Sequence, residues 1–234
     1  MTFTPQSSFS SLKRLGRRSD LLERDLLPNG MDIVSQVKSF ILENRNNGGL
    51  LTILGHPSAG KTTEFNRIAR NLQADESLTD DIFPLYSEFQ NSELSQDELD
   101  SSLIWKGILS GCVDINVFGS DILDSLETFC SHSKDLNRTP VIMIDTLDIL
   151  MLYNVDSENQ VDIASIWSEF LESAILNKVV LIWTCRPFEW KYFKEKIDDK
   201  YQNKIEYCDL PLLSKDNLSP FPELNLLDID CSDI

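Results

Sequence analysis

The sequence has few cysteines, few basic residues and no long apolar run, and each shortage excludes a class of protein. It contains five cysteines, an odd number, and no two of them form a Cys-x-x-Cys pair. This argues against a disulfide scaffold or a zinc site and favours free thiols in a reducing cytosol. The longest apolar runs, such as residues 179–183, are far too short to cross a bilayer. We therefore expect a cytoplasmic protein without a membrane-spanning segment.

Negative charge dominates the composition. The chain has 21 Lys and Arg against 38 Asp and Glu, which gives a formal net charge of -17. A surface this acidic repels phosphate backbones at long range, so we expect no direct nucleic-acid binding. The hydrophobic share of 41% and the charged share of 25% are ordinary for a globular protein and exclude global disorder.

Some of the few basic residues gather at the amino end. Residues 1–18 are rich in serine, contain no acid, and include Lys13, Arg14, Arg17 and Arg18. This composition predicts a flexible leader, and an organelle transit peptide is the alternative.

Short apolar runs alternate with helical patterns along the rest of the chain. The expected strands are Leu50–Leu54, Ile82–Tyr86, Val141–Asp145, Val179–Cys185 and Ile205–Leu210. The third and fourth runs are continuously apolar rather than alternating, which is typical of strands buried on both faces of a parallel sheet.

Helical patterns fill the segments between these strands. After Lys61, apolar residues recur at helical spacing through Phe65, Ile68, Ala69 and Leu72. Three further helices are predicted: one opened by a Ser95–Glu98 capping box, one capped by Asp121 that carries Ile122, Leu126 and Phe129, and one over the stripe from Ile163 to Ala174. Alternating strands and helices predict an α/β three-layer sandwich with a mostly parallel five-stranded sheet.

The segment after the first predicted strand carries the clearest chemical signal. Residues 55–62 match G-x-x-x-x-G-K-[ST], the Walker A loop that binds phosphate. Gly55 and Gly60 permit backbone angles that turn N–H groups inward around an anion, and the following helix points its positive end at the same place. The predicted nucleotide-binding residues are Gly55, His56, Pro57, Ser58, Ala59, Gly60, Lys61, Thr62 and Thr63.

Two side chains of this loop have specific predicted roles. Lys61 would reach the β- and γ-phosphates, and the Thr62 hydroxyl would bind Mg²⁺. Without nucleotide, we expect Lys61 to face solvent. His56 is expected to be a solvent-facing residue of the loop without a chemical role.

A Walker A loop needs an acidic partner at the end of a neighbouring strand. Asp145 ends the apolar run of residues 141–144 and is the predicted Walker B acid, which would hold Mg²⁺ together with Thr62. The alternative is that Asp145 only caps the segment after the strand. Thr146 stands where many ATPases have a Glu that orients the attacking water, and the next acid is Asp148.

The sequence resembles NACHT-type ATPases of the STAND class, which are relatives of the AAA+ proteins. Residues 145–150, Asp-Thr-Leu-Asp-Ile-Leu, are similar to their Asp-Gly-Leu-Asp-Glu-Leu pattern, and residues 183–187, Trp-Thr-Cys-Arg-Pro, resemble the Thr-Ser-Arg-Pro that ends their sensor strand. The resemblance covers about residues 45–215. It implies that Asp145 serves Mg²⁺, that Asp148 polarises water and that Arg186 reads the γ-phosphate.

The resemblance also implies a function and a domain organisation. The chain would be an ATP-binding and ATP-hydrolysing module of a signalling or defence protein, with other subunits or flanking domains as partners of the nucleotide-driven switch. Residues 1–18 would be the leader, residues 19–215 the core, and residues 216–234 an acidic tail or the start of a truncated lid. Thr146 and Ile149 depart from the family pattern, so a nucleotide-binding scaffold without turnover stays open, as does a small-molecule P-loop kinase.

Overall fold

The computed structural model describes residue 27 and residues 30–57, 59–89, 101–112, 122–145 and 163–211. The predicted leader, the predicted tail, the Ser95–Glu98 capping box and Asp121 lie outside these ranges. The domain boundaries expected from the sequence therefore stay predictions.

Five strands form one sheet in which every pair is parallel. They are β1 (Gly49–Leu54), β2 (Ile82–Glu88), β3 (Thr139–Asp145), β4 (Val180–Cys185) and β5 (Ile205–Asp209). Their order across the sheet is β2-β3-β4-β1-β5. The predicted parallel five-stranded sheet is confirmed. Both ends of each predicted strand fall within two residues of the ends of an observed strand.

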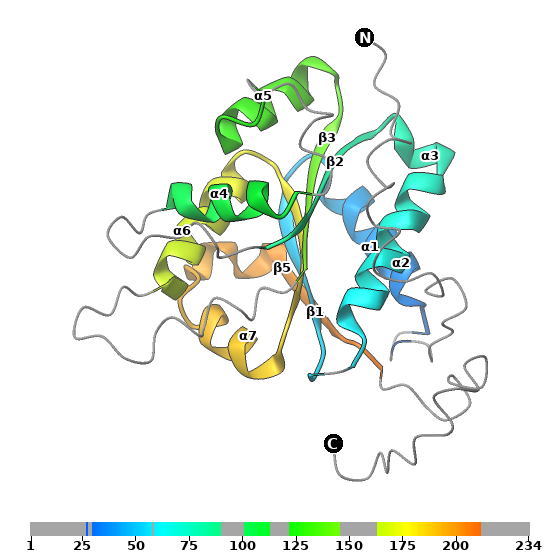
Figure 1. Ribbon diagram of the computed structural model, residues 1–234, viewed down its shortest axis with the longest axis vertical. Coiled ribbons are helices and arrows are strands. Elements are labelled where there is room, and N and C mark those ends of the chain that lie inside the picture. The colour runs from blue at the N-terminus through cyan, green and yellow to red at the C-terminus, as the bar shows by residue number, and fades with distance from the viewer. Residues whose placement is uncertain are drawn as a thin grey trace.

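Helices cover both faces of this sheet (Figure 1). On one face lie α1 (Ile33–Asn44), α2 (Lys61–Ala74) and α3 (Glu76–Thr79). On the other lie α4 (Ser101–Ser110), α5 (Leu126–Asp135), α6 (Ile163–Leu176) and α7 (Pro187–Lys194). A short 3-10 helix, η7 (Asp199–Lys204), leads into β5.

The core consists of one apolar cluster on each face of the sheet. Every residue of β1 and β4 is buried, because both strands have neighbours on each side and helices above and below. Side chains of α1 and α2 such as Phe40 and Phe65 fill one cluster, and side chains of α4 and α6 such as Trp105 and Trp167 fill the other. Three layers held by two clusters confirm the predicted sandwich.

One predicted helix begins later than expected. The sequence placed Ile122 inside a helix capped by Asp121, whereas α5 begins at Leu126. Its N-cap is Ser125, whose backbone is extended and whose hydroxyl oxygen accepts a hydrogen bond from the Thr128 N–H at 3.2 Å. The serine hydroxyl satisfies an N–H of the first turn, and this fixes the helix start four residues further along.

Candidate functional site

The Walker A loop connects β1 to α2 at the carboxyl edge of the sheet. Its first residue, Gly55, donates its N–H to the Cys185 carbonyl at 3.0 Å, which ties the loop to the end of β4. Gly60 is the N-cap of α2 and has a left-handed backbone with φ of 75°. The prediction that Gly60 supplies an angle forbidden to other residues is confirmed.

Gly55 has a different reason to be glycine from the one predicted. It is not among the glycines with positive φ. A Cβ atom at Gly55 would lie 2.9 Å from Cγ of Lys61 and 3.2 Å from its Cδ. The glycine therefore makes room for the Lys61 side chain, and the expectation about its backbone angle is wrong.

Lys61 folds over the loop rather than facing solvent. Its ammonium donates to the Gly55 carbonyl at 3.0 Å and to the His56 carbonyl at 3.3 Å, and the residue is half-buried. The expected solvent-facing lysine is therefore corrected, because two carbonyl oxygens of its own loop lie within its reach. The ammonium stands over the loop backbone and can exchange these neutral acceptors for charged oxygens of a ligand.

The remaining residues of the loop differ in their exposure. His56 is exposed, as expected, and so is Pro57, while Ala59 is buried. Thr62 and Thr63 are half-buried in the first turn of α2. Ser58 lies outside the described residues.

The start of α2 is suited to an anion. This helix has 14 residues, and its N-cap residue makes no side-chain hydrogen bond to the first turn. Backbone N–H groups at such an end carry partial positive charge and attract phosphate. The acid in the first turn, Glu64, is buried and accepts a hydrogen bond from Nε of Arg67 at 2.6 Å. This pairing neutralises a negative charge that would otherwise oppose a bound phosphate.

Asp145 ends β3 with 1% of its surface exposed. Its Oδ1 accepts a hydrogen bond from the Thr184 hydroxyl of β4 at 2.5 Å. Its Oδ2 has no hydrogen-bond partner in the part of the chain that the structure describes. A buried carboxylate oxygen without a partner is costly, so this atom is available to a ligand or to a group outside the described ranges.

A magnesium ion fits this arrangement. Mg²⁺ prefers oxygen ligands and is usually held by one or two carboxylates or hydroxyls together with waters and substrate phosphates. Asp145 offers one such oxygen, and Thr62 carries a hydroxyl in the first turn of α2. Within the described residues no group of three or more His, Cys, Asp and Glu forms a metal site, so the ion would depend on nucleotide oxygens. Residues 146–150, which Asp145 would cap in the alternative interpretation, lie outside the described ranges.

Sequence reasoning missed a second acid at the same edge. Glu88 is the last residue of β2, and in the sheet register it is the partner of Asp145. Burial raises the pKa of the half-buried Glu88 carboxyl, and the negative charge of Asp145 raises it further. The sequence did contain a signal, since this acid lies only two residues beyond the predicted end of the strand.

The structure describes only one of the two residues expected to read the γ-phosphate or to polarise the attacking water. Arg186 is exposed and is the N-cap of α7, directly after the Cys185 that bonds to the Walker A loop. The structure therefore brings Arg186 to the edge of the sheet where Lys61 and Asp145 lie. Asp148 lies outside the described residues, and its role stays a prediction.

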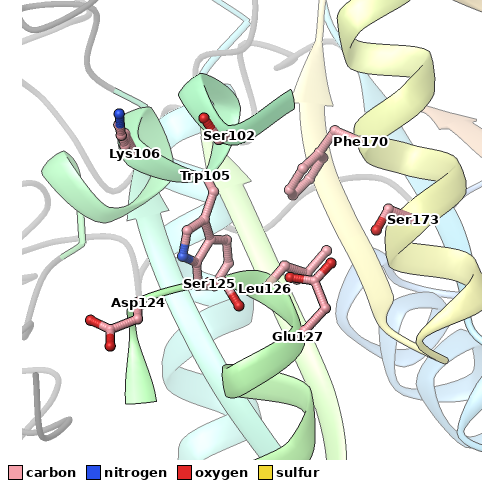
Figure 2. A pocket seen from close by; sticks show the side chains of 9 residues that line it. All are labelled: Ser102, Trp105, Lys106, Asp124, Ser125, Leu126, Glu127, Phe170 and Ser173. Atoms are coloured by element: carbon pink, nitrogen blue, oxygen red, sulfur yellow. The ribbon is translucent and has the colours of Figure 1, made fainter. Parts of the chain in front are cut away.

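A hollow of about 160 Å³ lies elsewhere, between α4, α5 and α6. Figure 2 shows its lining side chains, which are Ser102, Trp105, Lys106, Asp124, Ser125, Leu126, Glu127, Phe170 and Ser173. Trp105 donates its indole N–H to the Leu123 carbonyl at 2.9 Å, so its polar atom is already used. The hollow shares no residue with the Walker A loop and is not part of the candidate site.

Comparison with known proteins shows the fold. No protein-family profile and no curated protein sequence matches this chain. Two structures of the Aeropyrum pernix ORC2 protein are similar to it: complexes with ADPNP and ADP, with TM-score 0.51, 14% identity and coverage of 88% of this chain and 54% of that chain, and the ADP form, with TM-score 0.52, 13% identity and coverage of 89% and 56%. A chain in a structure of Drosophila ORC bound to DNA matches with TM-score 0.49 and 9% identity, covering 92% of this chain and 33% of that one.

This chain spans about half the length of the two ORC2 structures that it matches. Identities this low carry the fold alone. No helix in the described ranges is both long and apolar enough to traverse a bilayer. The sheet, its helices and these two neighbours together show that the chain has an α/β fold, a parallel five-stranded sheet between helices, which it shares with the ORC2 protein.

Proposed function

We propose that this chain is an ATP-binding module that uses Mg²⁺ and converts ATP slowly to ADP and phosphate. The observation that carries the proposal is the pairing of two features at one sheet edge. The Lys61 ammonium covers a Walker A loop at the open start of α2, and the buried Asp145 keeps one carboxylate oxygen without a partner in the described ranges.

Each part of a Mg²⁺–nucleotide complex has a residue suited to it. The phosphates would lie against the loop backbone and the first N–H groups of α2, with Lys61 neutralising their charge. Thr62 and Asp145 would hold the ion, whose chemistry is to neutralise charge on the phosphates. Arg186, a planar and permanently charged group, would contact the γ-phosphate.

The wider role that we propose is a nucleotide-controlled switch of a STAND or AAA+ signalling or defence protein. It is supported by the resemblance of residues 145–150 and 183–187 to that class, and by the nucleotide complexes of the structurally similar ORC2 protein. In this proposal, further domains or subunits would read the nucleotide state. The expectation of no direct nucleic-acid binding rests on the net charge of -17 and stays a prediction.

The proposal is tested by phosphate release from ATP in the absence of any acceptor. We expect slow, Mg²⁺-dependent release, which a small-molecule kinase without its acceptor would not give. ATP that stays bound and intact would favour the scaffold without turnover, which the replacement of the usual Glu by Thr146 supports.

A further inference from the structure

Glu88 is the last residue of β2, and backbone hydrogen bonds fix the chain around it. The N–H of the next residue, Phe89, donates to the carbonyl of Asp145 at 3.2 Å, so the parallel ladder continues past both acids. Glu88 and Asp145 are register partners and are close enough for the charge of one to act on the other. The two carboxylates therefore end neighbouring strands side by side at the carboxyl edge.

β2 is an edge strand of the sheet, and the residues at the end of α4 form hydrogen bonds with its last residues. The Glu88 N–H donates to the Gly111 carbonyl at 3.0 Å, and the Ser87 hydroxyl donates to the Ile108 carbonyl at 2.5 Å. A Cβ atom at Gly111 would overlap the Glu88 carbonyl oxygen, and one at Gly107 would overlap the Phe89 ring. Two glycines let α4 approach this closely, so the backbone of Glu88 is fixed on both sides.

The two acids differ in the freedom that they keep. Asp145 is buried, and one of its oxygens is bonded to Thr184, which suits a fixed group that holds a metal ion. Glu88 is half-buried and has a longer side chain, so its carboxylate can reach from a fixed backbone toward a ligand in the site. In phosphoryl transfer a base or water-positioning residue orients the attacking nucleophile, and a carboxylate of this second kind beside the metal-binding one can take that role.

We propose that Glu88 is the catalytic base of the ATPase reaction. Many ATPases use a glutamate directly after the Walker B acid for this role, and this chain has Thr146 at that position. This inference rests on the proposed function. The oxygen of a water forms a bond to the γ-phosphorus while the bond from that phosphorus to the β,γ-bridging oxygen breaks. The bridging oxygen leaves with ADP, and one proton of the water passes to the Glu88 carboxylate and then to solvent.

The test is single-turnover hydrolysis of γ-labelled ATP by wild type and by Glu88→Gln, with ATP affinity and the Mg²⁺ concentration dependence measured on the same samples. A general base contributes about 10²–10⁴-fold in rate. We expect Glu88→Gln to slow hydrolysis by about 100-fold or more while both binding values stay within about threefold. Glu88→Asp, which keeps the charge but shortens the side chain, should give an intermediate rate with unchanged affinity.

Two controls separate this role from others. Glu76→Gln removes an exposed carboxylate at the start of α3, beyond the far end of α2, and should leave the rate unchanged. Asp148→Asn tests the acid that the family resemblance favours. The proposal is overturned if Glu88→Gln hydrolyses ATP at the wild-type rate, if it loses Mg²⁺ or ATP affinity instead, or if wild type binds ATP without hydrolysing it. Wild type that binds ATP without hydrolysing it, or that does not bind ATP at all, would overturn the proposed function as well, whereas the two results with Glu88→Gln overturn only the role of Glu88.

Discussion

Asp145 is a buried residue whose hydrogen-bonding capacity the described part of the chain satisfies only in part. One oxygen accepts a hydrogen bond from Thr184, and the other has no partner in the described ranges although the residue is buried. A metal ion would satisfy the second oxygen, and the hydrogen bond from Thr184 to the first oxygen would keep the second one turned toward the ion. In the proposed metal site, Asp145 and Thr184 would form a unit that positions one oxygen for the ion.

Asp145→Asn should weaken Mg²⁺ binding in the presence of ATP while leaving the chain folded. An amide oxygen can still accept from Thr184, but it carries no full charge for the ion. Titrating Mg²⁺ at a fixed ATP concentration should show a half-saturation at least about tenfold higher than in wild type. An unchanged half-saturation in a folded variant would remove Asp145 from the metal site.

Arg186→Ala should cost more affinity for an ATP analogue than for ADP. A guanidinium at the end of β4 can pair with oxygens of the γ-phosphate, and that partner is absent from ADP. The difference in binding free energy should be about 1–3 kcal/mol, the range for a hydrogen bond to a charged group. Parallel titrations of both nucleotides decide the matter, since an arginine that only pairs with a surface acid would give equal losses.

At the scale of elements, the start of α2 depends on two glycines for different reasons. Gly60 needs a left-handed backbone, whereas Gly55 needs space for the side chain of Lys61. Gly60→Ala should lower the free energy of unfolding by about 1–2 kcal/mol, the cost of a left-handed residue that carries a Cβ. Gly55→Ala should cost less stability and more ATP affinity, because it displaces Lys61 from the loop.

Urea unfolding and nucleotide titration of both glycine variants check this prediction. The outcome that would contradict it is the same balance of stability and affinity losses in the two variants. That result would mean that one constraint, rather than two, accounts for both glycines.

Asp75 links α1 to α3 and gives the fold a dependence on pH. Its carboxylate pairs with the Lys38 ammonium of α1 at 2.8 Å and accepts a hydrogen bond from the Ser77 N–H at 3.0 Å. The Lys38 ammonium, followed by the Ser77 hydroxyl, lowers the pKa of Asp75 from its ordinary 3.8 to about 2. A carboxyl with a lowered pKa in the folded state stabilises the protein above its unfolded pKa and loses this contribution as the pH falls.

We therefore expect wild type to be more stable than Asp75→Asn above about pH 4, by up to about 1 kcal/mol for a partly exposed pair. The difference should shrink as the pH falls toward about 2, where the folded-state carboxyl takes up its proton. Chemical unfolding at several pH values measures the difference between the two proteins. A difference that stays constant across this range would show that the pair does not contribute.

At the scale of the whole molecule, the layers and the site were predictable to different degrees. The strands were found because parallel strands buried on both faces are continuously apolar, as in β3 and β4. The strand order was not predicted, because an apolar run does not show which strand it pairs with. The position of β4 between β1 and β3 places Thr184 beside Asp145, and no sequence pattern contained that contact.

The site itself was predicted where a motif fixes it and missed where packing does. The Walker A loop and Asp145 were predicted because their residue types and spacing follow from phosphate and metal chemistry, and their roles stay predictions. Glu88 was missed because the predicted strand ended at Tyr86, whereas β2 continues through Ser87, which is buried and donates a hydrogen bond to the Ile108 carbonyl of α4. The open orientation expected of Lys61 was wrong because it depends on carbonyl oxygens that only the folded loop brings near.

The central claim, ATP bound at the Walker A loop, is tested most directly by calorimetric titration of wild type and Lys61→Ala with ATP and Mg²⁺. Wild type should bind saturably, and ATP at about 100 times its dissociation constant should add about 2.7 kcal/mol to the free energy of unfolding. Lys61→Ala should stay folded and lose at least about tenfold in affinity, because the ammonium contributes a charge-assisted hydrogen bond. Lys134→Ala, which removes an exposed lysine from α5, should bind like wild type. Unchanged affinity in folded Lys61→Ala, or no binding by wild type, would contradict the account.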